Sequence, residues 1–304
     1  MIKKFEVEKD FHNTRFDRWF KNKVLDIPQG LIEKIIRKNQ VKVNGKKTKS
    51  SYRVQETDII EIFNIEKVKK TEKNLITQYV PSNTERDKYD DFIIENNENF
   101  IVINKPAGIA VQSGTKSFKN VVDTLRETKY FEDTKPFIVH RLDKETSGIL
   151  IVAKTREYAQ LFTSLFRIRK IHKIYLAVVY GEVSSELKIL EDDLVVFEKE
   201  RKIVQKATSY IKILKGSSDY SLLELRPITG RKHQLRKQLY NIGNSIIGDD
   251  KYYVKRGKDF IKSKNLMLHA YEIKFMINNV KYNFRADFNK EFKDFIIKKD
   301  LNIF

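Results

Sequence analysis

The sequence predicts an α+β protein with a mixed or antiparallel sheet, preceded by a small basic domain. Three observations carry this prediction. Short apolar runs typical of strands crowd the chain after residue 91, helical patterns lie between them, and the first quarter has a charge and pattern of its own. A chain of 304 residues is long enough for about two domains. We expect a basic domain at 1–65, a linker at 66–90 and the main domain at 91–304.

The charge of the chain indicates a polyanionic partner. Sixty Lys and Arg against 41 Asp and Glu give a net charge of +19. Cations that neutralise phosphates release counterions, which favours binding to nucleic acid. Residues 1–73 alone hold 19 basic and 11 acidic residues, a net charge of +8. The alternative is genomic composition, because the chain is rich in Ile, Lys and Asn. We favour nucleic acid.

Composition and missing motifs exclude several classes of function. The chain has no cysteine, which rules out disulfides, thiolate zinc sites and cysteine nucleophiles. Neither GxGxxG nor GxxxxGK[ST] occurs, so we expect no nucleotide cofactor. The five histidines form no i, i+4 pair, and we expect no metal. No run of 18 apolar residues occurs, and the first residues are too charged for a signal peptide. We therefore expect a soluble, cytoplasmic monomer without a membrane partner.

The first domain has the pattern helix, helix, strand, turn, strand. Pro28 suits the first turn of the second helix. Asn39 tolerates the left-handed conformation at a helix end. Val41 and Val43 alternate as in a strand, and Asn44-Gly45 predicts a tight turn. The apolar face of the second helix is formed by Leu31, Ile32, Ile35 and Ile36.

The main domain is rich in predicted strands. Residues 148–153 are apolar on both faces, which predicts a fully buried strand. Helical patterns cover 155–167 and 231–241. The other predicted strands lie at 92–95, 100–103, 174–180, 206–214, 220–227, 266–277 and 281–287.

Polar residues crowd the segment His140–Gly148, directly before the predicted buried strand. Asp143 lies between Arg141 and Lys144. Neighbouring cations keep a carboxylate ionised, which suits a nucleophile or a base. A rigid strand edge is where loops commonly hold reacting groups. The alternative is a salt-bridged aspartate in an ordinary loop.

A second polar cluster runs from Arg226 to Arg236. We expect Thr229 to cap a helix whose first turns carry Arg231 and Arg236, and a basic helix start suits phosphate. The alternative is a solvated basic face. A third cluster, Asn104–Gly108, combines an extended bend at Lys105-Pro106 with a glycine that allows close backbone approach. By itself it fits any structured loop.

Together the three clusters resemble RluA-type pseudouridine synthases, in the order found in that family. The segment His140–Leu150 resembles the active-site signature, Asn104–Gly108 the first motif, and Lys173-Ile174-Tyr175 with Gly181 the next. Arg226–Arg236 resembles the third, and Gly248-Asp249 and Leu268-His269-Ala270 follow it. One departure is Gln112, where many members have histidine.

Residues 13–63 resemble the RNA-binding module named after ribosomal small-subunit protein four. The matching segments are Thr14–Asp17, Ile32–Lys38 and Val41–Gly45. The family usually has glycine where Asn39 stands. This resemblance implies that Arg37, Lys38 and Lys42 face RNA phosphates.

The resemblance to the synthases implies an isomerase that detaches uracil at nitrogen 1 and rejoins it through carbon 5, without a cofactor. It implies that Asp143 attacks or deprotonates the nucleotide, that Arg236 pairs with Asp143, and that Tyr175 stacks on the base and assists proton transfer at carbon 5. Arg141 would fill the space left by the flipped uridine. Which atom Asp143 attacks stays open.

The remaining implied roles concern substrate binding. Leu235 would pack against the base, and Arg231 and Lys105 would bind substrate. His140 and His233 would be structural or contact RNA. The architecture is most similar to the branch that acts on the large ribosomal subunit, which implies 23S ribosomal RNA as the partner. Two alternatives stay open: a non-catalytic RNA-binding or ribosome-assembly factor, and a metal-dependent RNA nuclease.

Overall fold

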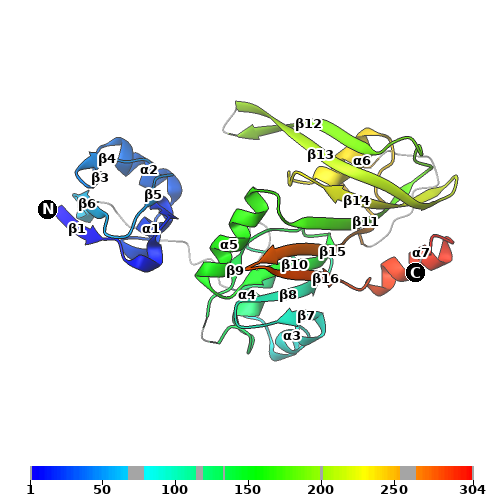
Figure 1. Cartoon of the computed structure of the whole chain (residues 1–304), viewed down its shortest axis with the longest axis horizontal. Helices are drawn as coiled ribbons and strands as arrows, with labels where there is room; N and C mark the ends of the chain where they lie inside the picture. Colours follow the sequence, from blue (N-terminus) through cyan, green and yellow to red (C-terminus); the bar gives the residue numbers. More distant parts are fainter. Residues whose placement is uncertain are drawn as a thin grey trace. The chain divides into compact units, whose positions relative to one another are not determined.

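The computed structural model describes residues 2–67, 79–113, 119–132, 134–198, 201–253 and 265–302. The chain forms two compact units, Met1–Thr77 and Gln78–Phe304, drawn in Figure 1. Residues 68–78 of the predicted linker lie outside the described residues.

Unit 1 packs two helices beside a small antiparallel sheet. The sheet has the order β1-β6-β3-β4, and β2 pairs with β5. Asn44 and Gly45, at φ 49° and 75°, form the predicted turn between β3 and β4, and Asn39 takes the predicted left-handed conformation at φ 54°. The elements are β1 (Ile2–Glu6), β2 (Thr14–Arg15), α1 (Phe16–Lys23), α2 (Gln29–Arg37), β3 (Val41–Val43), β4 (Lys46–Lys47), β5 (Arg53–Val54) and β6 (Ile59–Phe63), with short 3-10 turns at Lys9–Phe11 and Ile65–Lys67.

The core of unit 1 comes from the apolar faces that the sequence shows. Ile32 and Ile35 of α2 are buried, and they pack with Phe16, Trp19 and Phe20 of α1. The described part of this unit therefore has a hydrophobic core of its own.

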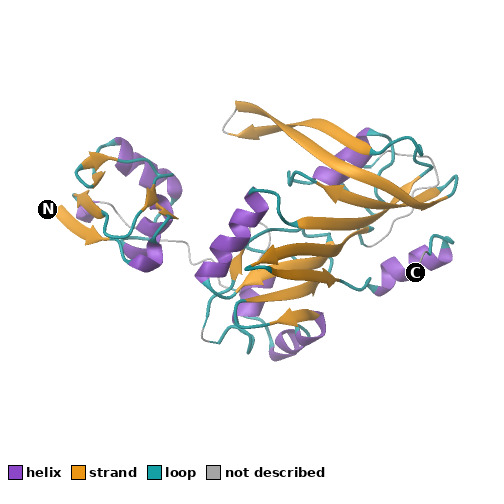
Figure 2. Cartoon of the chain, viewed as in Figure 1, coloured by secondary structure: helices purple, strands orange, loops and turns teal. Residues whose placement is uncertain are grey.

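Unit 2 is built on one mixed sheet of ten strands within its described part, as Figure 2 shows. The path is β12-β13-β14-β11-β15-β10-β8-β7, with β16 on β15 and β9 on β10. The strands are β7 (Ile93–Asn96), β8 (Phe100–Lys105), β9 (Phe137–Ile138), β10 (Ser147–Ala153), β11 (His172–Tyr180), β12 (Ile189–Glu198), β13 (Arg201–Gly216), β14 (Tyr220–Pro227), β15 (Leu268–Ile277) and β16 (Val280–Arg285).

The sheet joins two halves where β10 meets β15. These two strands are parallel and pair only at Ser147–His269 and Gly148–Ala270, whereas their other neighbours are antiparallel. β10 is buried along its whole length, as its apolar sequence predicts. The mixed sheet and the α+β class are confirmed.

Helices cover the sheet. In one half, α4 contributes Val121 and Leu125 to one hydrophobic cluster and α5 contributes Phe162 to another. In the other half, Leu239 of α6 and Phe292 of α7 join a third cluster. The helices of unit 2 are α3 (Asn83–Asp87), α4 (Val121–Arg126), α5 (Arg156–Arg167), α6 (Gln234–Asn241) and α7 (Lys290–Lys298), and a 3-10 turn spans Asp90–Phe92.

Three features differ from the sequence-based expectations. Part of the predicted linker belongs to unit 2: α3 begins with a capping box at Ser82, and Tyr89 is buried in a core cluster. β12 was missed, because its two-stranded ribbon with β13 is largely exposed and its sequence carries no sustained apolar pattern. The helix expected at 231–241 begins at Gln234. No helix in the described part is both long and apolar enough to cross a membrane.

Candidate active site

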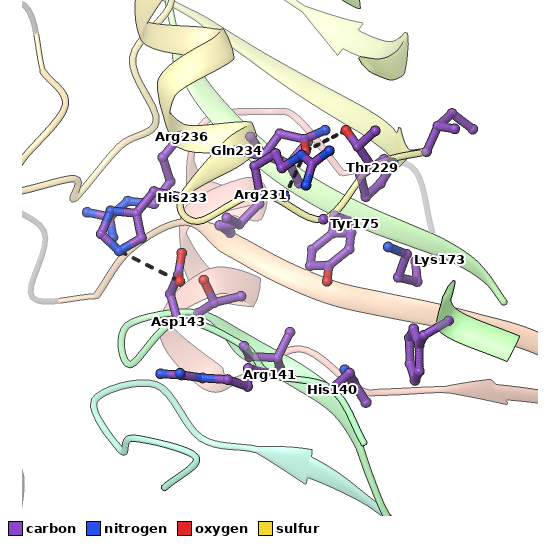
Figure 3. Close-up of a pocket in the computed structure, with 18 of the residues that line it drawn as sticks. His140, Arg141, Asp143, Lys173, Tyr175, Thr229, Arg231, His233, Gln234 and Arg236 are labelled. Atoms are coloured by element: carbon purple, nitrogen blue, oxygen red, sulfur yellow. Dashed lines mark hydrogen bonds and ion pairs between the residues drawn. The ribbon is translucent and has the colours of Figure 1, made fainter. Parts of the chain in front are cut away.

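A pocket of about 610 Å³ opens where the two halves of the sheet meet. Three segments line it, and Figure 3 shows how their side chains converge. We call them the Asp143 loop (139–146), the Arg236 segment (227–236) and the α5 end (166–170). Lys173 and Tyr175 of β11 and Leu268 of β15 complete the lining.

Asp143 is the acidic residue of this pocket lining. It lies in a turn closed by a hydrogen bond from Thr146 N to Asp143 O of 3.1 Å. Its side chain is 28% exposed, and His233 Nε2 lies 3.7 Å from its Oδ1. The carboxylate is therefore reachable from the pocket and is held in a largely basic setting.

Main-chain contacts hold the Asp143 loop against the sheet. Gly148, just after it, has φ +104°, and a Cβ there would lie 2.3 Å from Ala270 O. Only glycine allows β10 and β15 to approach this closely. On the other side, Gly108 N donates to Lys144 O at 2.9 Å, which ties the Asn104–Gly108 motif to the loop.

Lys105 also holds the loop, which corrects its predicted role in binding substrate. Its side chain is fully buried. Nζ donates to the carbonyl oxygens of Pro106, Ile109 and Lys144 at 2.8, 2.9 and 3.1 Å. Burial lowers the pKa of Lys105 to about 7, whereas three carbonyl partners match the three donors of the ammonium form. Lys105 therefore joins two motifs and does not reach the pocket.

His140 is a structural residue, one of the two roles considered for it. Its Nε2 accepts a hydrogen bond from Ile151 N of β10 at 2.9 Å, and its ring lies 4.7 Å from that of Phe166. Burial, and then the charge of Lys173, lower the pKa of His140 to about 3. The imidazole is thus neutral and anchors the start of the Asp143 loop to β10.

Tyr175 brings an aromatic ring and a hydroxyl into the pocket. β11 is paired on both sides at this residue, with Leu225 of β14 and Ala270 of β15. Burial, and then the charge of Asp143, raise the pKa of Tyr175. Figure 3 shows the ring beneath the Arg236 segment, with its hydroxyl on the side of the Asp143 loop.

The Arg236 segment is held by a side-chain amide. Gln234 Oε1 accepts from Thr229 Oγ1 at 2.7 Å and from Arg231 N at 3.0 Å. Its Nε2 donates to Thr208 O at 3.1 Å and to Ser209 Oγ at 2.9 Å. All four hydrogen-bonding positions of this buried amide are filled. The expectation that Thr229 caps α6 is wrong. Thr229 instead joins the preceding turn to β13, because its Oγ1 accepts a hydrogen bond from Thr208 N at 2.9 Å.

The residue at the N-cap of α6 is His233. Its backbone is left-handed at φ 54°, and it makes no side-chain capping bond. Nδ1 lies 3.0 Å from the hydroxyl of Tyr252, while Nε2 faces Asp143. Burial lowers the pKa of His233, and Asp143 acts against this. The unusual backbone at this position aims the imidazole at the carboxylate.

Arg236 does not pair directly with Asp143, which corrects the expected ion pair. Its guanidinium makes two hydrogen bonds to Asp249, from Nε at 2.7 Å and from Nη2 at 2.6 Å. The side chains of Arg236 and Asp249 are 5% and 0% exposed. Asp249 Oδ1 also accepts from Lys251 N and Tyr252 N. Arg236 acts on Asp143 only through its charge, and its bonds fix the turn that carries Tyr252.

The other predicted binding residues divide by location. Arg141 and Arg231 are exposed and line the pocket, and Leu235 lines it although it is 6% exposed. Arg37, Lys38 and Lys42 belong to unit 1. Among them, Arg37 and Lys38 are exposed, and Lys42 Nζ lies 5.6 Å from the centre of the Phe63 ring.

Several residues in or next to the pocket were not assigned a role from the sequence. Tyr252 does not line the pocket, and it lies between the Gly248-Asp249 and Leu268–Ala270 segments without belonging to either, so that its contact with His233 is what reveals it. Arg167 and Arg169 were missed because cations are common at the C-terminal end of a helix, so their presence there did not indicate a site. No cluster of potential metal ligands occurs among the described residues.

Comparisons with known proteins agree with this geometry. A sequence profile of the family described as RNA pseudouridylate synthase matches residues 99–241, and a profile of the S4 domain matches residues 14–60. The ribosomal large subunit pseudouridine synthase C of Rickettsia conorii is 35% identical over 277 residues, which cover 86% of this chain and 88% of the relative. The protein of the same name from Vibrio parahaemolyticus is 31% identical over 286 residues, covering 89% and 87%.

Solved structures show the same fold. The human protein titled RNA Pseudouridylate Synthase Domain Containing 4 superposes with a TM-score of 0.60 at 23% identity, over 71% of this chain and 95% of that chain. RNA Pseudouridylate Synthase Domain Containing 1, also human, superposes with a TM-score of 0.54 at 20% identity, over 65% and 83%. The predicted fold and both resemblances are confirmed.

Proposed function

Because the chain belongs to the RNA pseudouridylate synthase family, we propose that it converts uridine to pseudouridine in 23S ribosomal RNA, with Asp143 as the reacting group. The relatives named as large-subunit synthases support the choice of substrate. The observation that carries the role of Asp143 is its position: an accessible carboxylate in a pocket whose other lining residues are basic, apolar, Tyr, Thr, Gln and Gly.

The reaction breaks the bond between N1 of uracil and C1′ of ribose and forms one between C5 and C1′. The proton leaves C5, and N1 ends protonated. A carboxylate that attacks the nucleotide or removes a proton from it opens this sequence. Asp143 suits that role because its carboxylate is reachable from the pocket and faces His233 Nε2 at 3.7 Å.

Tyr175, which lines the same pocket as Asp143, has the proposed role of stacking on the uracil and assisting removal of the C5 proton. Its raised pKa keeps the hydroxyl protonated near neutral pH, so Tyr175 serves as a hydrogen-bonding relay and not as a phenolate base. Arg141, exposed at the pocket, is placed to occupy the space left by the flipped nucleotide, since a guanidinium plane stacks on bases.

The decisive experiment compares Asp143→Asn with the wild-type protein. The assay measures release of tritium from RNA labelled at C5 of uridine, and RNA binding is measured in parallel. We expect no release and an affinity within a few-fold of wild type, because the substitution keeps the shape and removes the charge. Turnover near wild type would contradict the assignment. A loss of binding of several hundred-fold would make Asp143 a structural residue.

The target RNA is identified by mapping pseudouridines in ribosomal RNA from cells with and without the gene. Loss of one or more sites in 23S RNA is expected. If the maps are unchanged but tritium release still depends on Asp143, the substrate is an RNA other than ribosomal RNA. A ribosome phenotype that survives Asp143→Asn would favour a non-catalytic assembly factor.

Unit 1 supplies a second RNA contact through Arg37, Lys38 and Lys42. A truncated protein that tests this role has to begin near residue 78 and not at Asp91, because Tyr89 and α3 belong to unit 2. It should isomerise a short RNA at high concentration and lose efficiency on long RNA, since a tethered contact raises effective concentration without changing the chemistry. Equal efficiency on long RNA would contradict this role.

A further inference from the structure

The pocket contains three cations that the proposed chemistry leaves unused. Arg167 and Arg169 lie at the α5 end, and Lys173 lies on β11. All three line the same pocket as Asp143. Their local structure and their lack of counterions indicate what they bind.

The chain turns sharply at the α5 end. α5 finishes at Arg167, and Arg169 is left-handed at φ 59°. Lys170 N donates to Leu165 O at 2.9 Å, so the chain reverses before β11 starts at His172. This turn brings Arg167 and Arg169 to the pocket, whereas the exposed Lys170 between them and the strand does not line it.

Lys173 shares a strand face with Tyr175, because side chains two residues apart on a strand point the same way. Figure 3 shows Tyr175 between Asp143 and Lys173. Burial lowers the pKa of Lys173, and its charge also lowers the pKa of His140. The ammonium group is thus partly removed from water beside a neutral imidazole.

Within the described residues, no carboxylate lies within ion-pairing distance of Arg167, Arg169 or Lys173, in contrast to Arg236 with Asp249. For the partly desolvated Lys173, the lack of a counterion is unfavourable, and an anion placed there relieves the cost. Arg167 and Arg169 are exposed at the same pocket, where their side chains can bind the same strand. Arginine and lysine both bind phosphate oxygens through charge-assisted hydrogen bonds. In a pocket that admits a nucleotide, the nearest anions are the phosphates of its own strand.

We propose that Arg167, Arg169 and Lys173 bind the backbone phosphates next to the uridine that enters the pocket. The inference rests on the proposed function. It adds the path of the RNA strand: the strand runs along the α5 end, on the side of Tyr175 that is away from Asp143. These residues act in binding and do not take part in the isomerisation.

The test uses the full chain and fluorescent pentauridylate, in two forms: one with ordinary linkages and one with a neutral methylphosphonate at the linkage on the 5′ side of the central uridine. The variants are Lys173→Gln and Arg169→Gln, singly and together, and Lys170→Gln is the matched control. Affinity is measured at several salt concentrations. Binding of this probe requires no isomerisation, so its result is separate from the tritium-release assay that tests the proposed function.

We expect the log–log salt slope of the double variant to fall in magnitude by about 0.7 for each phosphate that is no longer bound. The methylphosphonate should weaken binding to the wild type more than to the double variant, because the double variant does not bind that phosphate. Lys170→Gln should change neither quantity, and Lys173→Arg should keep the wild-type slope. A double variant with the wild-type slope, or with no weaker affinity than Lys170→Gln, would overturn the proposal even if the protein makes pseudouridine.

Discussion

The Asp143 loop and the Arg236 segment line the same pocket but are held in place by different means. The Asp143 loop is fixed by main-chain groups: the close approach at Gly148, the carbonyls around Lys105 and the bond from Gly108 to Lys144. The Arg236 segment is fixed by buried side chains, Gln234 and the Arg236–Asp249 pair. The Asp143 loop should tolerate most neighbouring substitutions, except where a glycine is required and where a buried side chain such as that of Lys105 or His140 binds the main-chain groups. A segment held by polar side chains depends on each partner, because a buried group that loses its partner stays costly.

The largest effect is expected from Gly148→Ala, in β10 just after the Asp143 loop. The new Cβ would overlap the backbone of Ala270, which cannot move without breaking the junction of β10 and β15. We expect the free energy of unfolding to fall by more than about 4 kcal/mol in urea titrations. The control is Gly108→Ala, which has φ +83° but open space around it and should cost about 1 kcal/mol. Equal effects would mean that strain in φ, and not the close approach, decides.

Asp249→Asn should give the next largest effect, in the Arg236 segment. It leaves the buried guanidinium of Arg236 without its counterion, at a cost of about 3 kcal/mol. Asp250→Asn is the matched control, since Asp250 contacts the same guanidinium at 3.3 Å but its side chain is 84% exposed. It should cost less than about 0.5 kcal/mol. Similar losses for the two variants would show that burial of the pair is unimportant.

Lys105→Met should cost about 2 kcal/mol near neutral pH, because three carbonyls lose a donor. The pH dependence is more specific. The folded pKa of about 7 is below that of the unfolded chain, so the unfolded state binds more protons above pH 7. Stability of the wild type relative to Lys105→Met should therefore rise as pH increases from about 7 to about 10, with a slope approaching 1.4 kcal/mol per pH unit. The control is Lys144→Met, which removes an exposed side chain of the Asp143 loop. It should leave the dependence of stability on pH as it is in the wild type. A flat difference would contradict a buried, titrating Lys105.

The smallest effect is expected for Tyr252→Phe. It removes the hydroxyl that holds Nδ1 of His233 and keeps the ring over Arg236. One lost hydrogen bond costs about 1 kcal/mol, and we expect a few-fold lower rate at saturating RNA because the imidazole beside Asp143 is less well placed. Tyr240→Phe, at a neighbouring exposed ring, is the control and should leave the rate unchanged. An unaltered rate for Tyr252→Phe would show that the hydrogen bond from Tyr252 does not position His233 for the reaction.

The sequence by itself determined the fold class, most strands of the main sheet and the motifs that meet at the pocket. β10 was predictable because both its faces are apolar, and the loop before it because polar groups crowd the end of a buried strand. These are local properties, written in a few consecutive residues. The exposed ribbon of β12 and the first turn of α6 were not predictable, since neither carries a strong apolar pattern.

Only the tertiary structure decided the partners of the polar groups. The sequence does not show which carboxylate pairs with Arg236. In the structure, residues 249–252 pack against α6, so that Arg236 binds Asp249 and not Asp143. Lys105 has a charge that suggests RNA, yet it is turned inward because three carbonyls of two loops converge on it. His233 has a left-handed backbone and lies with Nε2 3.7 Å from Asp143, although 90 residues separate the two in the chain. Such choices depend on which chain segments are brought together in space, and pairing over long distances leaves no periodic trace in the sequence.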